Sequence, residues 1–413
     1  MNKLIFIVCF LFSAVVNAQE IISPLFPSDS AKHEINLNFS GYYHNTSLSN
    51  EFLGLFYHGG HLDSSLKNEM SENLFGENRI GGELSYGIRY RNLHAHLFGK
   101  PAWGWYASVS NHAFYHARYS ENAFNLLFYG NRRFAGDTAP LQNVNFESIQ
   151  FQKFTFGGFH KDNHSYIGVS FLKGQDYKSF DMNRANLYTA PLGEEIALDL
   201  HASYTQTDTL RKGLNAFNGW GLSTDLVFYL NMGKNRNVKF QNTFQIAIRD
   251  LGFIRWNDKS LYTETDSSYY FDGFEVEDIF DSASYNFSDR LRDSLEISPV
   301  NKVYTTILPF CFSFAKVADP VSGDKIQGFY GVRVRAFAWY KPLFYAGIFY
   351  RPVKNVSMNV YASAGGYGKF RIGYSINACL IKKIKISLTS SDIIGWTKNG
   401  NGKDASIQLS YEF

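Results

Sequence analysis

The carboxy-terminal segment, residues 405–413, alternates strictly between apolar and polar side chains. Ala405, Ile407, Leu409, Tyr411 and Phe413 share one parity, and the residues between them are Ser, Gln, Ser and Glu. A period of two places these two sets on opposite faces of a β-strand. We therefore predict a strand that separates an apolar environment from a polar one.

The same alternation recurs along most of the chain, with turn-forming residues between the segments. Within 148–157 the parity of the apolar residues changes at Lys153, which indicates a β-bulge. The predicted strands cover 35–39, 84–90, 103–110, 148–157, 167–171, 196–204, 220–230, 240–248, 310–314, 330–336, 344–350, 356–362, 370–376, 384–388 and 405–413. This pattern predicts an all-β protein, a transmembrane antiparallel β-barrel of about 14 strands, because single-chain barrels of this kind have an even number.

The amino-terminal residues 1–18 have the features of a secretory signal peptide. Lys3 precedes an apolar run from Leu4 to Val16, and Val16-Asn17-Ala18 fits a cleavage site with small residues, so we expect cleavage after Ala18. Residues 19–413 would then form one barrel domain. No later apolar run reaches the roughly 20 residues that a spanning helix needs. Such an exported chain is expected in the outer membrane as a barrel, since only helices and closed barrels satisfy the backbone in hydrocarbon.

The composition favours a membrane barrel over a soluble β-sandwich or propeller. The mean hydropathy of −0.23 is compatible with a barrel in which only alternate residues face lipid. Aromatic residues make up 17% of the chain, including 38 Phe and 27 Tyr, which a lipid-facing band and its interfacial girdles would use. A soluble sandwich would not require export and outward aromatic residues together.

Three segments have helical rather than strand periodicity. They are 63–75 after Asp63, 121–128 after Ser120 and 289–296 after Ser288, and Ser and Asp are favoured helix N-caps. We expect short helices there, in loops or in the lumen. The acidic stretch 257–300 is too long for a tight turn, so we expect it to be an extracellular loop.

Charged residues on the polar parity are expected to face the barrel lumen. The candidate lumen-lining residues are Arg89, Arg249, Arg333, Arg335, Lys369, Arg371, Asp199 and Asp225. Such a lumen guides an anionic or amphipathic solute, or else it holds an internal network of ion pairs, since buried charges need partners. Bulky aromatic residues share this parity, namely Phe329, Phe337, Trp339, Tyr345 and Phe349. They favour a partly plugged lumen over a wide channel.

The sequence offers little support for catalysis, metal binding or nucleic-acid binding. It has no Gly-x-Ser-x-Gly motif, and its histidine pairs at 58/61, 94/96 and 112/116 fall short of the ligand set of a zinc site. The net charge of +3 is too small to imply a nucleic-acid partner. Cys311 and Cys379 are expected to be unpaired. We expect no enzyme activity and no cofactor, and keep a barrel hydrolase as an alternative.

Three motifs, in their order along the chain, resemble those of a known family. They are Leu127-Phe-Tyr-Gly-Asn-Arg-Arg-Phe-Ala-Gly136, Asp250-Leu-Gly-Phe-Ile-Arg-Trp256 and Phe274-Glu-Val-Glu-Asp-Ile-Phe280, followed by Leu308-Pro309. The chain resembles a family of Bacteroidota outer-membrane barrels known as domain of unknown function 5723, itself distantly similar to fatty acid transporters of the FadL type. This resemblance implies a barrel over most of the mature chain and assigns no functional residue.

The terminal Phe413 resembles the end of the closing strand in bacterial outer-membrane barrels, whose assembly machinery recognises a terminal aromatic residue. This resemblance implies that Phe413 is an assembly signal and that the barrel-assembly machinery is a partner during biogenesis.

These features together predict an outer-membrane channel or transporter for a small amphipathic or anionic solute. The alternative is a non-conducting accessory subunit of an outer-membrane secretion or assembly complex, with the acidic loop as a docking surface. The expected partners are outer-membrane lipid and, under the alternative, other proteins of such a complex.

Overall fold

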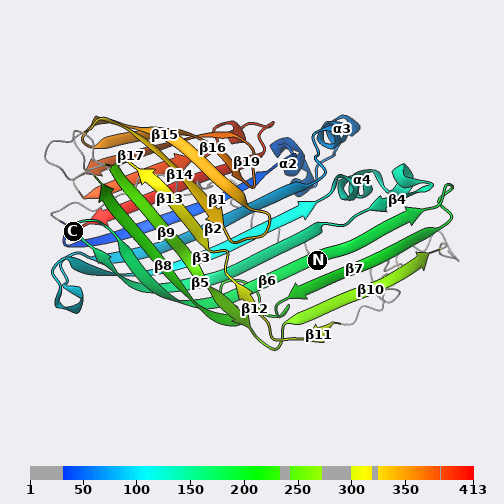
Figure 1. The fold of residues 1–413 in the computed structure, drawn as a ribbon, viewed down its shortest axis with the longest axis horizontal. Helices are drawn as coiled ribbons and strands as arrows, with labels where there is room; N and C mark the ends of the chain where they lie inside the picture. The colour runs from blue at the N-terminus through cyan, green and yellow to red at the C-terminus, as the bar shows by residue number, and fades with distance from the viewer. Residues whose placement is uncertain (1–30, 233–241, 272–298, 319–323, 382) are drawn as a thin grey trace.

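The chain folds into a closed antiparallel barrel of 14 strands, as predicted (Figure 1). The computed structural model describes residues 31–232, 242–271, 299–318, 324–381 and 383–413. The expected signal peptide, the helix expected at 289–296 and the motif at 274–280 lie outside these residues.

Around the wall the barrel strands follow in chain order, and β1 closes the barrel against β19, from Glu34↔Glu412 to His44↔Gly402. The strands are β1 (His33–Asn45), β2 (Asn78–Asn92), β3 (Trp103–Tyr119), β5 (Val144–His160), β6 (Tyr166–Thr189), β8 (Gly219–Met232), β9 (Asn242–Trp256), β13 (Cys311–Val317), β14 (Ile326–Arg335), β15 (Lys341–Val353), β16 (Val356–Gly366), β17 (Arg371–Ile381), β18 (Ile384–Ser390) and β19 (Gly402–Glu412).

The two faces of the wall differ in polarity as the alternation predicts. On β8, Leu222, Phe228 and Leu230 are about half-exposed on the outside, whereas Ser223 and Asp225 are buried inside. The same arrangement of apolar outside and polar inside recurs on the other barrel strands. An apolar exterior on a wall without free edges is suited to contact with lipid.

The bulge predicted at Lys153 is wrong. The register of β5 against β3 is continuous along residues 145–160. Phe151 and Lys153 are both buried inside, whereas Phe154 is 40% exposed outside. Phe151 and Lys153 thus point to the same face of the strand. The apolar alternation breaks at Lys153 because the lumen is apolar around Phe151 and polar around Lys153. The irregularity lies instead in the neighbouring β6, which skips Gln175 in its pairing with β5.

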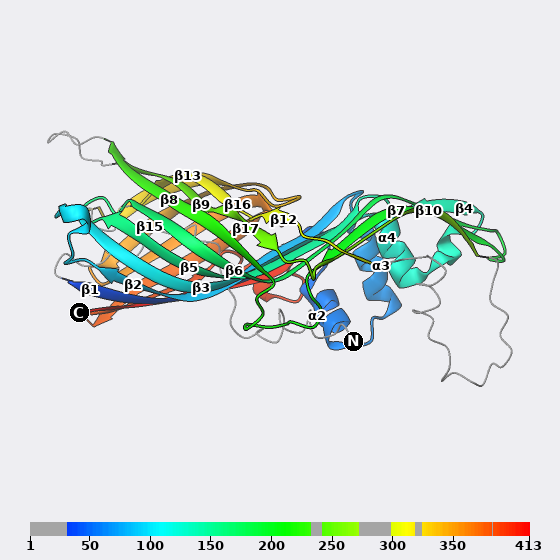
Figure 2. The same ribbon diagram turned by 90° about the horizontal axis from the view of Figure 1, so that it is seen from below.

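A flat extension of the sheet continues beyond one end of the barrel (Figures 1 and 2). The first part of β6 pairs with β8, and its second part pairs with β7 (Ile196–Gln206) and β4 (Asp137–Pro140). The outer neighbour of β7 is β10 (Leu261–Phe271). Two short strands, β11 (Val300–Asn301) and β12 (Thr305–Ile307), lead back to the barrel.

The prediction of a loop throughout 257–300 is wrong for its first part, because residues 261–271 form β10. This strand carries polar side chains on both faces, so its sequence shows no apolar alternation. Its backbone pairing with β7 holds it in place. Tyr262 donates a hydrogen bond to Glu264 at 2.7 Å, and this bond lowers the pKa of that carboxyl group.

Three α-helices gather at the end of the barrel that carries the extension, which we call the helix end (Figure 2). The helices are α2 (Asn50–His58), α3 (Ser64–Glu72) and α4 (Glu121–Tyr129), and they pack through Phe52, Met70 and Phe124. Short 3-10 helices lie at η1 (Leu97–Gly99), η2 (Asn131–Phe134) and η3 (Ile394–Trp396). None of the helices in the described ranges is long and apolar enough to cross a membrane.

The helices predicted near 63–75 and 121–128 are confirmed, with Asp63 and Ser120 as their N-caps. The prediction missed α2, although Ser49 accepts a hydrogen bond from the Phe52 amide as its N-cap. Opposite the helix end, the backbone of Phe413 pairs with that of His33.

Candidate functional site

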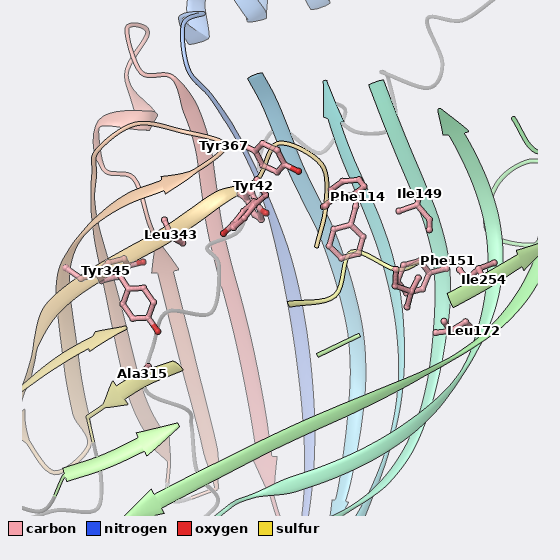
Figure 3. Packing of buried hydrophobic residues seen from close by; sticks show 14 of the residues in the cluster. Tyr42, Phe114, Ile149, Phe151, Leu172, Ile254, Ala315, Leu343, Tyr345 and Tyr367 are labelled. Atoms are coloured by element: carbon pink, nitrogen blue, oxygen red, sulfur yellow. The ribbon is translucent and has the colours of Figure 1, made fainter. Parts of the chain in front are cut away.

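A layer of aromatic and aliphatic side chains fills the barrel lumen toward the helix end (Figure 3). Its buried members come from many strands around the wall, including Tyr42, Phe114, Ile149, Phe151, Leu172, Ile254, Ala315, Leu343, Tyr345 and Tyr367. Of the aromatic residues predicted to face inward, Phe337 and Tyr345 belong to this layer, and Phe329 and Phe349 extend the same buried cluster along β14 and β15 toward the opposite end. The fifth, Trp339, is 41% exposed, and the guanidinium of Arg118 lies 3.6 Å from its ring centroid.

The connection between β14 and β15 contributes to this layer by crossing the lumen. Phe337 lies in this connection and contacts two residues of β3, His116 at 4.4 Å and Phe114 at 6.3 Å between ring centroids. Several strands separate β3 from β14 around the wall. Tyr340, in the same connection, meets Tyr367 at 5.3 Å. The lumen is therefore filled at this level by side chains from opposite walls.

An ion pair crosses the lumen beside this layer. Arg335 Nη2 on β14 donates to Glu83 Oε2 on β2 at 2.9 Å, and Nη1 donates to the Pro309 carbonyl at 3.0 Å. The Arg335 guanidinium also lies 4.8 Å from the ring centroid of Phe114. A buried charge is stable only when it is paired and hydrogen-bonded. Arg335 meets both conditions and joins the aromatic layer to the charged region next to it.

A second buried cluster joins β5, β8 and β9. Lys153 Nζ lies 2.7 Å from Asp225 Oδ2 and 2.6 Å from Asp250 Oδ1. The Asp250 amide also donates to Asp225 Oδ1 at 2.8 Å. Asp250 has a φ of 61° next to a register shift between β8 and β9, a backbone conformation that is uncommon outside glycine. The shift turns a second carboxylate toward the same ammonium group.

Between the aromatic layer and the opposite end lies a polar chamber of about 270 Å³. Its wall includes hydroxyl and amide groups such as Ser40, Ser85 and Gln245. Its described basic residues are Arg89, Arg91, Lys153, Arg249, Arg333 and Arg335, and its described acidic residues are Glu83, Asp225 and Asp250. Basic groups therefore outnumber carboxylates, which makes the chamber suited to an anionic group.

The structure brings most of the predicted lumen residues together. Five of them line the chamber, namely Arg89, Arg249, Arg333, Arg335 and Asp225. Arg371 is buried at the start of β17, toward the helix end.

The two other predicted lumen residues lie elsewhere. Lys369 is exposed in the connection before β17, where its ammonium lies 5.4 Å from the ring centroid of Phe75. Asp199 lies on β7 in the sheet extension and accepts a hydrogen bond from Arg184 at 2.9 Å. Apolar and polar residues do alternate along β7, as predicted. However, β7 belongs to the sheet extension, so its polar face does not line the barrel lumen.

Sequence reasoning missed Lys153 and Asp250 as members of the site. The change of parity at Lys153 predicts a bulge, although a single lysine within an apolar stretch is also typical of a buried ion pair. Asp250 begins the motif 250–256, whose pattern indicates a family resemblance but no ion pair. Its orientation depends on the register shift, which no sequence pattern specifies.

One serine–histidine contact occurs in the chamber, but it lacks the third group of a catalytic triad. Ser110 Oγ lies 2.9 Å from His112 Nε2, and the buried Nδ1 of His112 has no hydrogen-bond partner in the described structure. A catalytic histidine needs an acidic group that orients it. Within the described residues there is also no group of three or more potential metal ligands.

Comparison with known proteins gives a family and several similar barrels. Residues 27–388 match the model of a family of unknown function, DUF5723. A deletion mutant of the monoaromatic hydrocarbon channel TodX is similar over 94% of this chain and 91% of its own, with a TM-score of 0.42 and 10% identity. The toluene transporter TodX of P. putida covers the same shares with a TM-score of 0.36 and 11% identity. The monoaromatic hydrocarbon channel CymD covers 93% and 89%, with a TM-score of 0.30 and 6% identity. No curated protein sequence matches.

Proposed function

Because the chain belongs to DUF5723, a family of unknown function, we propose its role from the lumen itself. We propose that it is an outer-membrane channel or transporter for a small amphipathic solute with an anionic head group. The observation that carries this proposal is the direct contact between an aromatic layer and a chamber in which basic residues outnumber acidic ones.

The outer surface of the barrel supports the membrane location. Large apolar side chains are exposed on alternate positions of the wall, including Phe312, Phe344, Ile348 and Val360. In water such a surface would be unfavourable, whereas a bilayer would cover it. The closed wall leaves no unpaired strand edge in the hydrocarbon.

The two parts of the lumen match the two parts of an amphipathic solute. Arg249 and Arg333 would bind the anionic head, since a guanidinium forms charge-assisted hydrogen bonds with an oxyanion. The rings of Phe114, Phe151 and Tyr345 would contact the apolar tail. The filled layer argues against a wide aqueous pore, so we expect single solutes to pass rather than a large ionic current.

Uptake into liposomes tests this proposal. The full-length protein is reconstituted, and uptake of radiolabelled octanesulfonate is compared with protein-free liposomes. This probe stays ionised, so it crosses lipid slowly on its own. We expect protein-dependent uptake, and a decrease of about tenfold in Arg249→Gln, since a hydrogen bond to a charged group contributes about 1.5–3 kcal/mol.

Lys173→Gln is the matched control, because Lys173 lies on the outer face of β6 and donates to the Leu214 carbonyl at 3.1 Å. Its uptake should equal that of the unmodified protein. Uptake no faster than in protein-free liposomes would overturn the proposal.

The sheet extension favours a second candidate, a non-conducting accessory subunit of an outer-membrane complex. Its strands, the turn between β6 and β7 and the adjoining α4 expose large apolar side chains, including Tyr270, Leu192 and Leu127 respectively. Apolar groups exposed outside the barrel wall are typical of contact with another protein. Gentle extraction of the full-length protein from native membranes, followed by mass spectrometry, would give a stoichiometric partner under this candidate. Protein that runs alone would exclude it.

A further inference from the structure

Two guanidinium groups and an imidazole converge near Tyr367 at the helix end of the lumen. Arg371 begins β17, Arg79 lies near the start of β2, and His44 lies near the end of β1. A Cβ built on Gly368 would lie 2.3 Å from Arg371 Nη1 and 3.2 Å from His44 Cβ. This glycine therefore allows the backbone to pack directly against both side chains.

The ring of Tyr367 lies next to this cluster of basic side chains. His44 pairs in register with Gly81, and a Cβ at Gly81 would lie 2.5 Å from the Tyr367 ring. The ring also stacks on His116 at 6.4 Å between centroids. Figure 3 shows Tyr367 beside Tyr42 at the edge of the aromatic layer. The basic groups thus lie where the layer meets the helix end.

The buried donors of this cluster are not satisfied within the described protein. Arg371 is 3% exposed, and Nη2 makes a single hydrogen bond of 3.3 Å to the Gly365 carbonyl, while Nε and Nη1 have no partner. His44 is 1% exposed, and both its ring nitrogens have no partner. Arg79 Nε is also buried without a partner. Buried donors in folded proteins are normally hydrogen-bonded.

The two carboxylates that act electrostatically on Arg371, those of Asp404 and Asp392, already accept hydrogen bonds from other groups. Asp404 accepts hydrogen bonds from Ser390 Oγ and from the Ser391 amide, each at 2.7 Å. Asp392 accepts one from the Gly395 amide at 2.8 Å. Within the described residues, neither Arg79 nor Arg371 forms an ion pair with a carboxylate.

Arg79 and Arg371 are therefore held close together without a described carboxylate in ion-pair contact, since Asp392 and Asp404 act on Arg371 electrostatically but form no ion pair with it. Arg371 acts electrostatically on both Arg79 and His44. A buried charge without a partner is strongly unfavourable, and an oxyanion offers the acceptors that these donors lack. The planar guanidinium fork matches the geometry of a carboxylate.

We propose that Arg79, Arg371 and His44 form a binding site for the carboxylate of an amphipathic solute, with the rings of Tyr367 and Tyr340 against its apolar part. This inference rests on the proposed function and deepens it: the solute binds here first, on the opposite side of the aromatic layer from the chamber. Basic groups on both sides of the layer would give the head group a binding site before and after its passage.

Crystals of the full-length protein soaked in 4-iodobenzoate test this site directly. The iodine gives an anomalous signal, and the probe combines a carboxylate with an aromatic ring. We expect a peak within contact of Tyr367 and its carboxylate on Arg371. Iodine in the chamber alone, or at the outer wall alone, would overturn the inference.

Binding in detergent solution gives a second measurement. We expect 4-iodobenzoate, but not neutral 4-iodobenzamide, to raise the melting temperature, since a ligand that binds the folded state stabilises it. Arg371→Gln should weaken binding at least about tenfold, through loss of a charge-assisted contact. Arg371→Lys keeps the charge without the fork and should bind with intermediate affinity, which separates binding from a folding defect.

Arg184→Gln is the matched control, because Arg184 is exposed in the sheet extension and paired with Asp199. It should bind 4-iodobenzoate like the unmodified protein. An iodine peak near Tyr367 without octanesulfonate uptake would support this site and refute the transport proposal. Uptake without such a peak would refute this site alone.

Discussion

Arg335 and Glu83 form an ion pair across the full width of the barrel lumen, with Nη2 and Oε2 2.9 Å apart. Their strands, β14 and β2, are separated by the same number of strands in either direction around the wall. The connection that follows Arg335 begins with a hydrogen bond from the Ala336 amide to the Phe310 carbonyl at 2.8 Å. The ion pair therefore anchors the segment that carries Phe337 across the lumen.

Glu83→Gln should destabilise the barrel and increase its conductance. The substitution leaves the buried charge of Arg335 without its carboxylate, which costs about 3 kcal/mol or more. The segment anchored by Arg335 should then fill the lumen less completely. Urea unfolding in liposomes and single-channel recording in planar bilayers measure the two effects. Glu51→Gln is the control, because its partner Lys398 is 81% exposed, and loss of this surface ion pair should cost less than about 1 kcal/mol. Equal stability of the two variants would contradict the prediction.

Lys153→Met should be among the most destabilising substitutions in the wall. It leaves the carboxylates of Asp225 and Asp250 facing each other without a cation, at a cost of roughly 3–5 kcal/mol. Adding Asp225→Asn and Asp250→Asn should restore part of the stability, because the amides carry no charge. The urea midpoint is the measurement. Lys398→Met, at an 81% exposed lysine paired with Glu51, should leave it nearly unchanged.

Phe337→Ala should open the lumen at the level of the aromatic layer. The ring contacts His116 and Phe114 on the far wall, and its removal leaves a cavity between them. We expect a measurable rise in bilayer conductance. Phe312→Ala removes a ring of the same size from the lipid-facing side, where Phe312 is 40% exposed, and should not change conductance. A conductance that is the same in both variants would show that this layer does not limit passage.

Phe413→Ala tests the proposed assembly signal. The ring is 44% exposed and stacks on His33 at 5.2 Å and on Tyr411 at 5.6 Å. These contacts are few, so the purified and refolded variant should be about as stable as the unmodified protein. In cells, however, the fraction of folded barrel in the membrane should fall several-fold. Tyr411→Ala also removes an aromatic ring from the last strand and should assemble normally. Normal assembly of Phe413→Ala would refute the signal.

The positions of the strands, and the side of the wall that each side chain faces, follow from the alternation of apolar and polar residues. Arg333 and Arg335 could be placed inside because they alternate with Val332 and Val334 on a strand that separates two environments. The same reasoning failed for Asp199, since alternation does not tell a barrel strand from a strand of the extension. It also failed for β10, which is polar on both faces and is held by its backbone pairing with β7.

The sequence by itself determined the barrel, the polarity of its two faces and the basic character of its interior, because each follows from side chains two residues apart. Only the tertiary structure decided which interior residues meet. Arg335 and Glu83 are 252 residues apart in the chain, and Lys153 is 72 and 97 residues from its two carboxylates. Parity gives the face of a side chain but not its partner, because the partner depends on strand register, on closure of the wall and on the segment that crosses it.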